Sequence, residues 1–270
     1  ADFLLDGEEA VLLILTLPEK NDGPAFTLKF GLLNQCQARL RFELAHTDLN
    51  VWLLPREGGY LKPICGGQRV DLARVSRLRL AVGAKGDNPV RWCMTPLRLS
   101  TEEPEQLAEP LLPQGVLVDE LGQWAIRDWS GKSRTRAEVS ERLKEQLAEA
   151  PSKRWPDGFS RWGGCASKRV DATGFFGTHH DGKRWWLVDP DGHLFWSAGV
   201  DCVRSSITGN CRGLETALAS PSLCSRGTVD HFRDNLEQAF GGTWHDTWAA
   251  LTLGIIRDLG FNTVANWSEW

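Results

Sequence analysis

The first 100 residues consist mainly of short apolar or alternating runs separated by turn-forming residues. In Arg77–Val82, apolar and polar side chains alternate, which suits a strand with one packed face and one wet face. Clusters such as Asn21–Pro24 and Gly66-Gly67 interrupt the runs, and such clusters favour turns. Many short strands joined by turns predict a β-sandwich over residues 1–100. The expected strands are Val11–Leu17, Ala25–Leu33, Ala38–Leu44, Asn50–Leu54, Arg69–Val75, Ser76–Val82 and Thr95–Ser100.

Residues 101–160 have the composition of a linker followed by a connecting helix. Three prolines and four glutamates within 101–115 favour a solvated, extended segment. Further on, Thr135 and Glu138 have the spacing of a capping box, in which each side chain can bind a free N–H of the first helical turn. Apolar residues then recur every four positions until Pro151, so we expect one helix that packs along a single face.

Two hairpin turns are predicted at the start of the last segment, residues 161–270. Asp181-Gly182 and Asp191-Gly192 are dipeptides that favour tight hairpin turns. They divide the sequence into three expected strands at about 174–180, 183–188 and 193–199. The third strand runs on toward Val203.

The end of the chain follows a helix, helix, strand pattern. Phe232, Leu236 and Phe240 form one apolar stripe, and a second stripe ends at Gly260, which suits the C′ position of a helix. The run Phe261–Ala265 then predicts a buried strand. A strand, its helices and a following strand form one βα repeat of a parallel sheet.

Composition narrows the classes of partner. The net charge is −4, so no basic surface indicates nucleic acid, and no apolar run reaches the roughly 18 residues of a membrane span. The chain has 13 tryptophans and one tyrosine. Exposed indole rings stack well on sugar rings, so carbohydrate is a natural partner class, although any single tryptophan is more often a large core or surface-anchoring residue.

Seven cysteines and six histidines show no metal-binding spacing, and we expect no metal and no cofactor. The adjacent His179 and His180 should point to opposite faces of a strand, which argues against a shared ion. Asp189 and Asp191 suit a turn better than a calcium site. The pair Cys211 and Cys224 lies in one loop-rich stretch and could form a disulfide, which the sequence does not decide.

Three segments resemble bacterial β-agarases and related clan A glycoside hydrolases. The run Lys183–Val203 resembles the hairpin and first barrel strand of these enzymes, and Leu259–Ser268 resembles their second barrel strand. The segment Leu117–Lys132 is similar to their connection between sandwich and barrel. The resemblance implies a multidomain β plus α/β fold. A carbohydrate-binding-like β-sandwich (1–100) and a linker with a helix (101–160) would precede the first βα units of a (β/α)₈ TIM barrel (161–270).

The resemblance also implies hydrolysis of β-galactosidic linkages in agarose-type polysaccharide, by a retaining mechanism with two carboxyl groups. In the family, the two glutamates follow the fourth and seventh barrel strands, so the corresponding positions are expected beyond Trp270. The chain is accordingly interpreted as the front part of a longer enzyme and is expected to be inactive alone. Glu269 follows a barrel strand, and barrel active sites are built on the loops after the strands. We nevertheless expect Glu269 to be a loop residue or a residue that lines the substrate, not a catalytic one.

The residues predicted to bind substrate are Asp201, at the end of the first barrel strand, and Asn266, Trp267 and Ser268, at the end of the second. Carboxylate, amide and hydroxyl groups suit sugar hydroxyls, and the indole of Trp267 could stack on a ring. The alternative is that Asp201 and Asn266 hold their loops through backbone hydrogen bonds.

Two other functions remain open from the sequence. The chain could be a non-catalytic carbohydrate-binding protein, or part of a clan A hydrolase of another galactoside. In each case the partner is a polysaccharide or oligosaccharide, with no nucleic acid and no membrane span. The agarase-like interpretation predicts an extracellular or periplasmic protein, although no signal peptide is visible.

Overall fold

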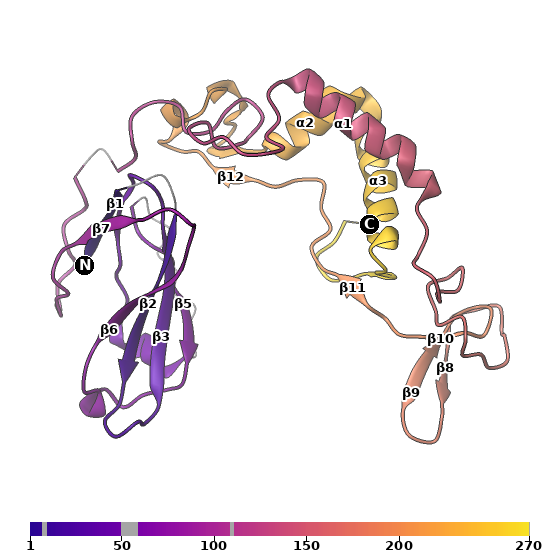
Figure 1. Cartoon of the computed structure of the whole chain (residues 1–270), viewed down its shortest axis with the longest axis horizontal. Coiled ribbons are helices and arrows are strands. Elements are labelled where there is room, and N and C mark those ends of the chain that lie inside the picture. Colours follow the sequence, from indigo (N-terminus) through magenta and orange to yellow (C-terminus); the bar gives the residue numbers. More distant parts are fainter. Residues whose placement is uncertain (7–9, 50–58, 109–110, 270) are drawn as a thin grey trace. The chain divides into compact units, whose positions relative to one another are not determined.

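The computed structural model describes residues 1–6, 10–49, 59–108 and 111–269. The chain forms two compact units, Ala1–Gly115 and Val116–Trp270 (Figure 1). Within the described residues, no helix is both long and apolar enough to cross a membrane.

The larger sheet of the first unit has four antiparallel strands in the order β5-β3-β2-β6. Its strands are β2 (Val11–Pro18), β3 (Ala25–Leu32), β5 (Ile64–Gly67) and β6 (Arg79–Lys85). Burial alternates residue by residue along β2 and β3, because successive side chains of a strand point to opposite faces. The buried positions hold leucine, valine and phenylalanine, so one face of this sheet is a continuous apolar surface.

A second antiparallel sheet, in the order β4-β1-β7, shares its core with the first. It consists of β1 (Asp2–Asp6), β4 (Gln37–Arg39) and β7 (Arg91–Met94). Phe3 on β1 packs edge-on against Phe30 on β3, with ring centroids 5.5 Å apart, and also contacts Trp92 on β7. Two sheets that enclose one apolar core form a sandwich.

Three of the expected strands differ from the structure. The expected strand 38–44 is reduced to β4, which ends at Arg39, and a 3₁₀ helix begins at Leu44. In 69–75 the chain instead makes a short 3₁₀ helix at Leu72–Arg74, whose start is capped by the Asp71 carboxylate. In 95–100 there is no strand; the strand lies just before it, at β7, and ends ahead of Pro96, which has no N–H for a ladder. The expected strand 50–54 lies outside the described residues.

The second unit begins with loops and helix α1 (Arg136–Glu149). Thr135 caps its N-terminus by accepting from the Glu138 N–H at 3.1 Å, as predicted. The Glu138 carboxylate reaches back one residue further than a capping box requires, to the Arg134 N–H at 2.6 Å. Helix α1 packs against α2 (His231–Phe240) and α3 (Trp244–Asp258).

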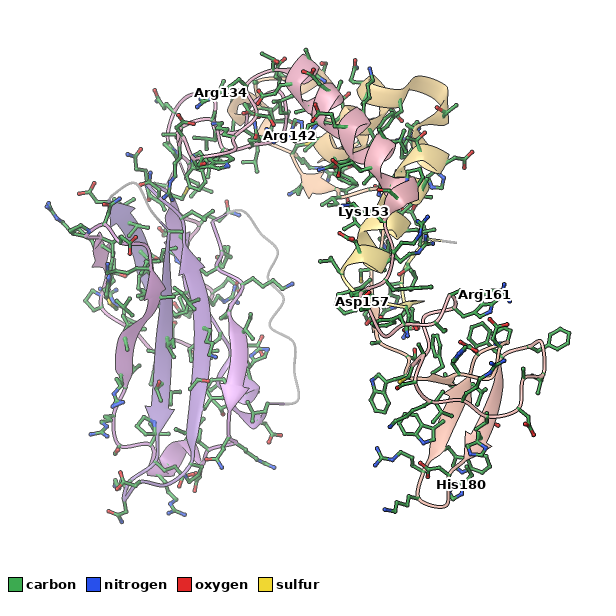
Figure 2. All side chains as sticks on the ribbon, turned by 45° about the vertical axis from the view of Figure 1, so that its right-hand side comes forward. Arg134, Arg142, Lys153, Asp157, Arg161 and His180 are labelled. Carbon is green, nitrogen blue, oxygen red and sulfur yellow. A yellow bond between two sulfur atoms is a disulfide. The ribbon has the colours of Figure 1, made fainter. Side chains whose placement is uncertain are left out.

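The two predicted hairpin turns join the strands of a three-stranded antiparallel sheet, in the order β10-β9-β8. Its strands are β8 (Gly177–His180), β9 (Trp185–Val188) and β10 (Leu194–Phe195), and Figure 2 shows His180 beside the β8–β9 turn. The Asp181 carboxylate accepts from the Trp186 indole N–H at 2.7 Å and from two backbone N–H groups of the turn. These hydrogen bonds, led by the one from Trp186, lower the pKa of Asp181.

A parallel strand pair completes the unit: β11 (Gly199–Val200) lies beside β14 (Thr263–Val264). The strand expected to run from 193 toward Val203 is therefore divided, since β10 ends at Phe195 and β11 belongs to a different sheet. The buried strand expected over 261–265 is reduced to the two half-buried residues of β14. Both α2 and α3 lie between these strands in the sequence, so the segment is a β-helix-helix-β unit (Figure 1). A Cβ at Gly199 would lie 2.4 Å from the carbonyl oxygen of Thr263, so only glycine allows the two backbones to approach this closely. Gly260 ends α3 with φ +82°, as predicted for a C′ residue.

The long connection after β11 contains the hairpin β12 (Gly209–Asn210) and β13 (Thr228–Val229). A disulfide joins Cys211 to Cys224 and lies in a small apolar cluster with Leu218 and Val229, so the possible pairing of these cysteines is confirmed. The remaining 3₁₀ helices are Leu44–Asp48, Ala150–Ser152, Glu215–Ala217, Pro221–Leu223 and Gly241–Thr243.

Candidate functional site

The segments that follow β11 and β14 remain hydrogen-bonded after the two strands end. The Cys202 N–H donates to the carbonyl of Asn266 at 2.9 Å, and the Glu269 N–H donates to the carbonyl of Val203 at 2.9 Å. Between them, the Val203 N–H donates to the hydroxyl of Ser268 at 3.1 Å. The carboxyl ends of two parallel strands therefore form one connected surface, which is where α/β folds place their binding sites.

The structure brings all four predicted binding residues to this surface, but it gives them different environments. Asp201 and Asn266 are exposed, and among the described residues their side chains make no hydrogen bond or ion pair. Trp267 is 68% exposed, whereas Ser268 is only 8% exposed and its hydroxyl accepts from Val203. Asp201, Asn266 and Trp267 thus have free side chains, while Ser268 holds the two segments together.

Glu269 is the centre of a second set of contacts. Its carboxylate accepts from the Ser205 N–H at 3.0 Å and from the Ser205 hydroxyl at 2.6 Å, and Nε2 of His245 lies 3.1 Å away. These hydrogen bonds, led by that of the Ser205 hydroxyl, outweigh burial and lower the pKa of Glu269. A carboxylate with a lowered pKa is poorly suited to donate a proton near neutral pH. The contacts themselves tie the end of β14 to the β11 loop and to α3.

Serine, histidine and glutamate also occur in nucleophilic triads, but the geometry here is different. In a triad the imidazole receives the serine proton and the carboxylate orients the imidazole. Here the carboxylate of Glu269 accepts directly from the hydroxyl of Ser205, which is 3% exposed. Such an arrangement stabilises a loop and gives the Ser205 hydroxyl no imidazole to receive its proton.

The sequence did not reveal Arg204, Ser205 or His245 as members of this site. Arg204 Nε donates to the carbonyl of Trp267 at 2.7 Å, across 63 positions of sequence. The contacts of Ser205 and His245 with Glu269 span 64 and 24 positions. No local pattern marks such residues, because their partners are brought near only when β11 pairs with β14.

The aspartates of the β9–β10 turn have structural roles. Asp189 is fully buried and accepts from the Ser160 hydroxyl at 2.5 Å and from the N–H groups of Asp191 and His193. Burial alone would raise the pKa of Asp189, but these hydrogen bonds lower it. Asp191 pairs with Arg161 at 2.6 Å. In the described ranges, no three histidine, cysteine or acidic side chains cluster in a way that could hold a metal ion.

Comparison with curated proteins relates the chain to agar-degrading enzymes. Beta-agarase B of Vibrio sp. (strain JT0107) is 27% identical over 195 residues, which are 57% of this chain and 20% of that protein. Beta-agarase A of the same strain is 28% identical over 109 residues, 32% of this chain and 11% of that protein. The chain is similar to β-agarases. The matched segments span a fifth or less of these relatives, and no protein-family model matches.

Solved agarase structures share the fold of this β-agarase-like chain. The crystal structure of an agarase aligns with 99% of the chain at a TM-score of 0.53, with 17% sequence identity, and the aligned part is 44% of that protein. An exo-β-agarase aligns with 99% of the chain at a TM-score of 0.52, with 20% identity and 46% of that protein covered. At these identities the likeness establishes the fold alone, over less than half of each enzyme.

Proposed function

We propose that the chain supplies part of the substrate cleft of a glycoside hydrolase that acts on agarose-type polysaccharide. The observation that carries this proposal is the presence of free Asp201, Asn266 and Trp267 side chains at the ends of two neighbouring parallel strands, in a chain similar to β-agarases. Carboxylate and amide groups bind sugar hydroxyls, and an exposed indole stacks on the C–H face of a sugar ring.

In this proposal, β11, α2, α3 and β14 are the first βα units of a (β/α)₈ barrel within 161–270. The parallel register of β11 and β14 and the helices between them support it. Residues 1–100 are the carbohydrate-binding-like sandwich, and 101–160 connect the two. Barrel enzymes bind substrate on the loops that follow their strands, which is where the free side chains lie.

The proposed reaction cleaves β-galactosidic linkages with retention, and it needs an acid/base and a nucleophile about 5–5.5 Å apart. We assign neither role to a described residue, and Glu269, the carboxylate that follows β14, binds Ser205 and His245. The contribution of these residues is to bind and orient the glycan. Hydrolysis of agarose by the pure 270-residue chain, measured as released reducing sugar, would contradict this assignment.

An extracellular or periplasmic location belongs to the same proposal. Disulfides persist in oxidising compartments and are rare where thiols are kept reduced. The Cys211–Cys224 disulfide supports such a location. Trapping free thiols with an alkylating reagent during extraction, followed by mass spectrometry, would show whether this pair is oxidised in the cell.

Trp267→Ala tests the binding role. We expect it to weaken binding of agarohexaose at least tenfold in isothermal titration calorimetry, because the stacking surface is lost. Trp129→Ala is the matched control: its indole is 42% exposed and lies away from β11 and β14 in sequence and contacts. Equal affinity of wild type and Trp267→Ala would refute the role, and preference for a galactan of other linkage would favour a hydrolase of another galactoside.

A further inference from the structure

Two residues with left-handed backbone conformations lie beside each other at the ends of β11 and β14. They are Cys202, with φ +57°, and Trp267, with φ +61°, and neither is a glycine. A positive φ is sterically unfavourable for residues with a Cβ and is a marked outlier for one as bulky as tryptophan. Such conformations persist only where neighbouring contacts enforce them, and they concentrate at functional sites.

The contacts that enforce the conformation of Trp267 surround it on both sides. The carbonyl of Asn266 accepts from Cys202 at 2.9 Å, and the hydroxyl of Ser268 accepts from Val203 at 3.1 Å. The carbonyl of Trp267 itself accepts from Arg204 Nε at 2.7 Å. Because a carbonyl rotates with the ψ angle of its residue, this last hydrogen bond restrains the ψ angle of Trp267, and the contacts of Asn266 and Ser268 restrain the residues on either side.

The conformation places the large side chain of Trp267 outside and the small one of Ser268 inside. Trp267 is 68% exposed, and Ser268 is 8% exposed. Within the described part of the chain, the Trp267 ring makes no ring–ring or cation–π contact, unlike Trp244 and Trp248 of α3. Packing of the ring therefore does not account for the strained backbone, whereas presentation of the ring to a ligand does.

We propose that Arg204 is a positioning residue, which holds Trp267 in its left-handed conformation and so presents the indole as a preformed surface for a sugar ring of an agarose-type chain. The nature of the ligand rests on the proposed function, but the positioning of the ring does not. A residue whose backbone is already held in the binding conformation loses less conformational freedom on binding, so the guanidinium of Arg204 raises affinity without touching the sugar.

The positioning is tested first without ligand. In the perdeuterated 270-residue chain, the Nε1–H resonance of Trp267 is assigned by its disappearance in Trp267→Phe, and its ¹H–¹⁵N nuclear Overhauser effect reports ordering of the ring. Arg204→Ala should lower this value clearly. Arg142→Ala, which removes the same charge from a 3.3 Å pair on α1 (Figure 2), should leave it unchanged. An unchanged value in Arg204→Ala, with folding verified by circular dichroism, would overturn the proposal.

A double-mutant cycle with agarohexaose then separates positioning from direct contact. Arg204→Ala should weaken binding about 3- to 10-fold, the effect of ordering one large side chain. In a Trp267→Ala background the same change should have no further effect, because Arg204 acts through the ring. An equal loss in both backgrounds would show that Arg204 contacts the sugar itself and would refute positioning. If the wild type fails to bind, the proposed function is wrong, while the relaxation measurement still decides the role of Arg204.

Discussion

Replacement of Glu269 by alanine tests the interpretation of this residue as a structural carboxylate. The wild-type side chain accepts from the N–H and the hydroxyl of Ser205, at 3.0 and 2.6 Å, and contacts His245 at 3.1 Å. These contacts join the end of β14 to the β11 loop and to the first turn of α3. In Glu269→Ala all three are lost together, so the connection between three segments is weakened by one substitution.

The expected cost follows from the burial of Ser205, which is 3% exposed. A buried donor left without an acceptor costs about 1–3 kcal/mol, and Ser205 has two such donors. Water can reach part of the site, since the side chain of Glu269 is 31% exposed, and this reduces the total. We therefore expect a loss of about 2–4 kcal/mol in the free energy of unfolding, which lowers Tm by roughly 5–12 °C for a unit of this size.

Differential scanning calorimetry of the 270-residue chain provides the measurement. Glu237→Ala is the control, because Glu237 forms an exposed i,i+4 pair with Arg233 on α2 and such pairs contribute at most about 0.5 kcal/mol. If Glu269→Ala shifts Tm by no more than the control does, the carboxylate is not structural, and the reasoning that removes it from the catalytic candidates fails.

The same carboxylate predicts a specific pH dependence. The pKa of Glu269 in the folded chain lies below its ordinary value of 4.5, so its contribution to stability is fully present above that value and is lost as the pH falls through the folded pKa. The difference in unfolding free energy between wild type and Glu269→Gln should be constant above about pH 5.5 and shrink below about pH 4.5. A difference that grows on acidification would contradict this sign.

Three further variants and one control test the scaffold around the site. Asp189→Ala should cost about 3–5 kcal/mol in urea denaturation, because the lost carboxylate is fully buried and accepts from the Ser160 hydroxyl and two backbone N–H groups, and a cost below about 1 kcal/mol would refute that role. Replacing Cys211 and Cys224 together by alanine should remove about 2–3 kcal/mol, the effect of opening a loop closed across 13 positions, and a Tm equal to that of the oxidised wild type would disprove it. Gly199→Ala should destabilise by about 2 kcal/mol or more, since its new methyl group would lie 2.4 Å from a backbone oxygen, whereas Gly177→Ala, with open space around it, should change stability by less than about 1 kcal/mol.

Sequence patterns predicted the strands in which the local apolar pattern agrees with the burial that strand pairing produces. Val11–Leu17 is a nearly continuous apolar run and Ala25–Leu33 alternates, and both were placed to within a residue, because β2 and β3 each bury one face against the same core. The prediction failed where pairing overrides local signals. Gly66-Gly67 has the character of a turn, but these residues form the end of β5, since Gly67 adopts φ +80° and approaches the backbone of β3 more closely than a side chain would allow.

In the candidate site, too, the sequence predicted some features and missed others. The four residues at the strand ends were predicted together because the carboxyl ends of parallel strands meet, and the structure places Asp201 beside 266–268 for that reason. What the sequence could not show is which side chains are free. Burial of Ser268 and exposure of Trp267 depend on a left-handed residue between them, and no pattern of hydrophobicity predicts a positive φ at a tryptophan.

The order of residues 266–269 separates binding from stability within one short segment. Asn266 and Trp267 have side chains without partners among the described residues, whereas Ser268 and Glu269 bind Val203 and Ser205. Substitutions at the first pair should therefore change affinity with little effect on Tm, and substitutions at the second pair should change Tm first and affinity only as a consequence. The four residues are consecutive in sequence. Distance to the ligand alone would therefore not explain why two of them change affinity and the other two change Tm. It requires the hydrogen bonds that join the β11 and β14 segments.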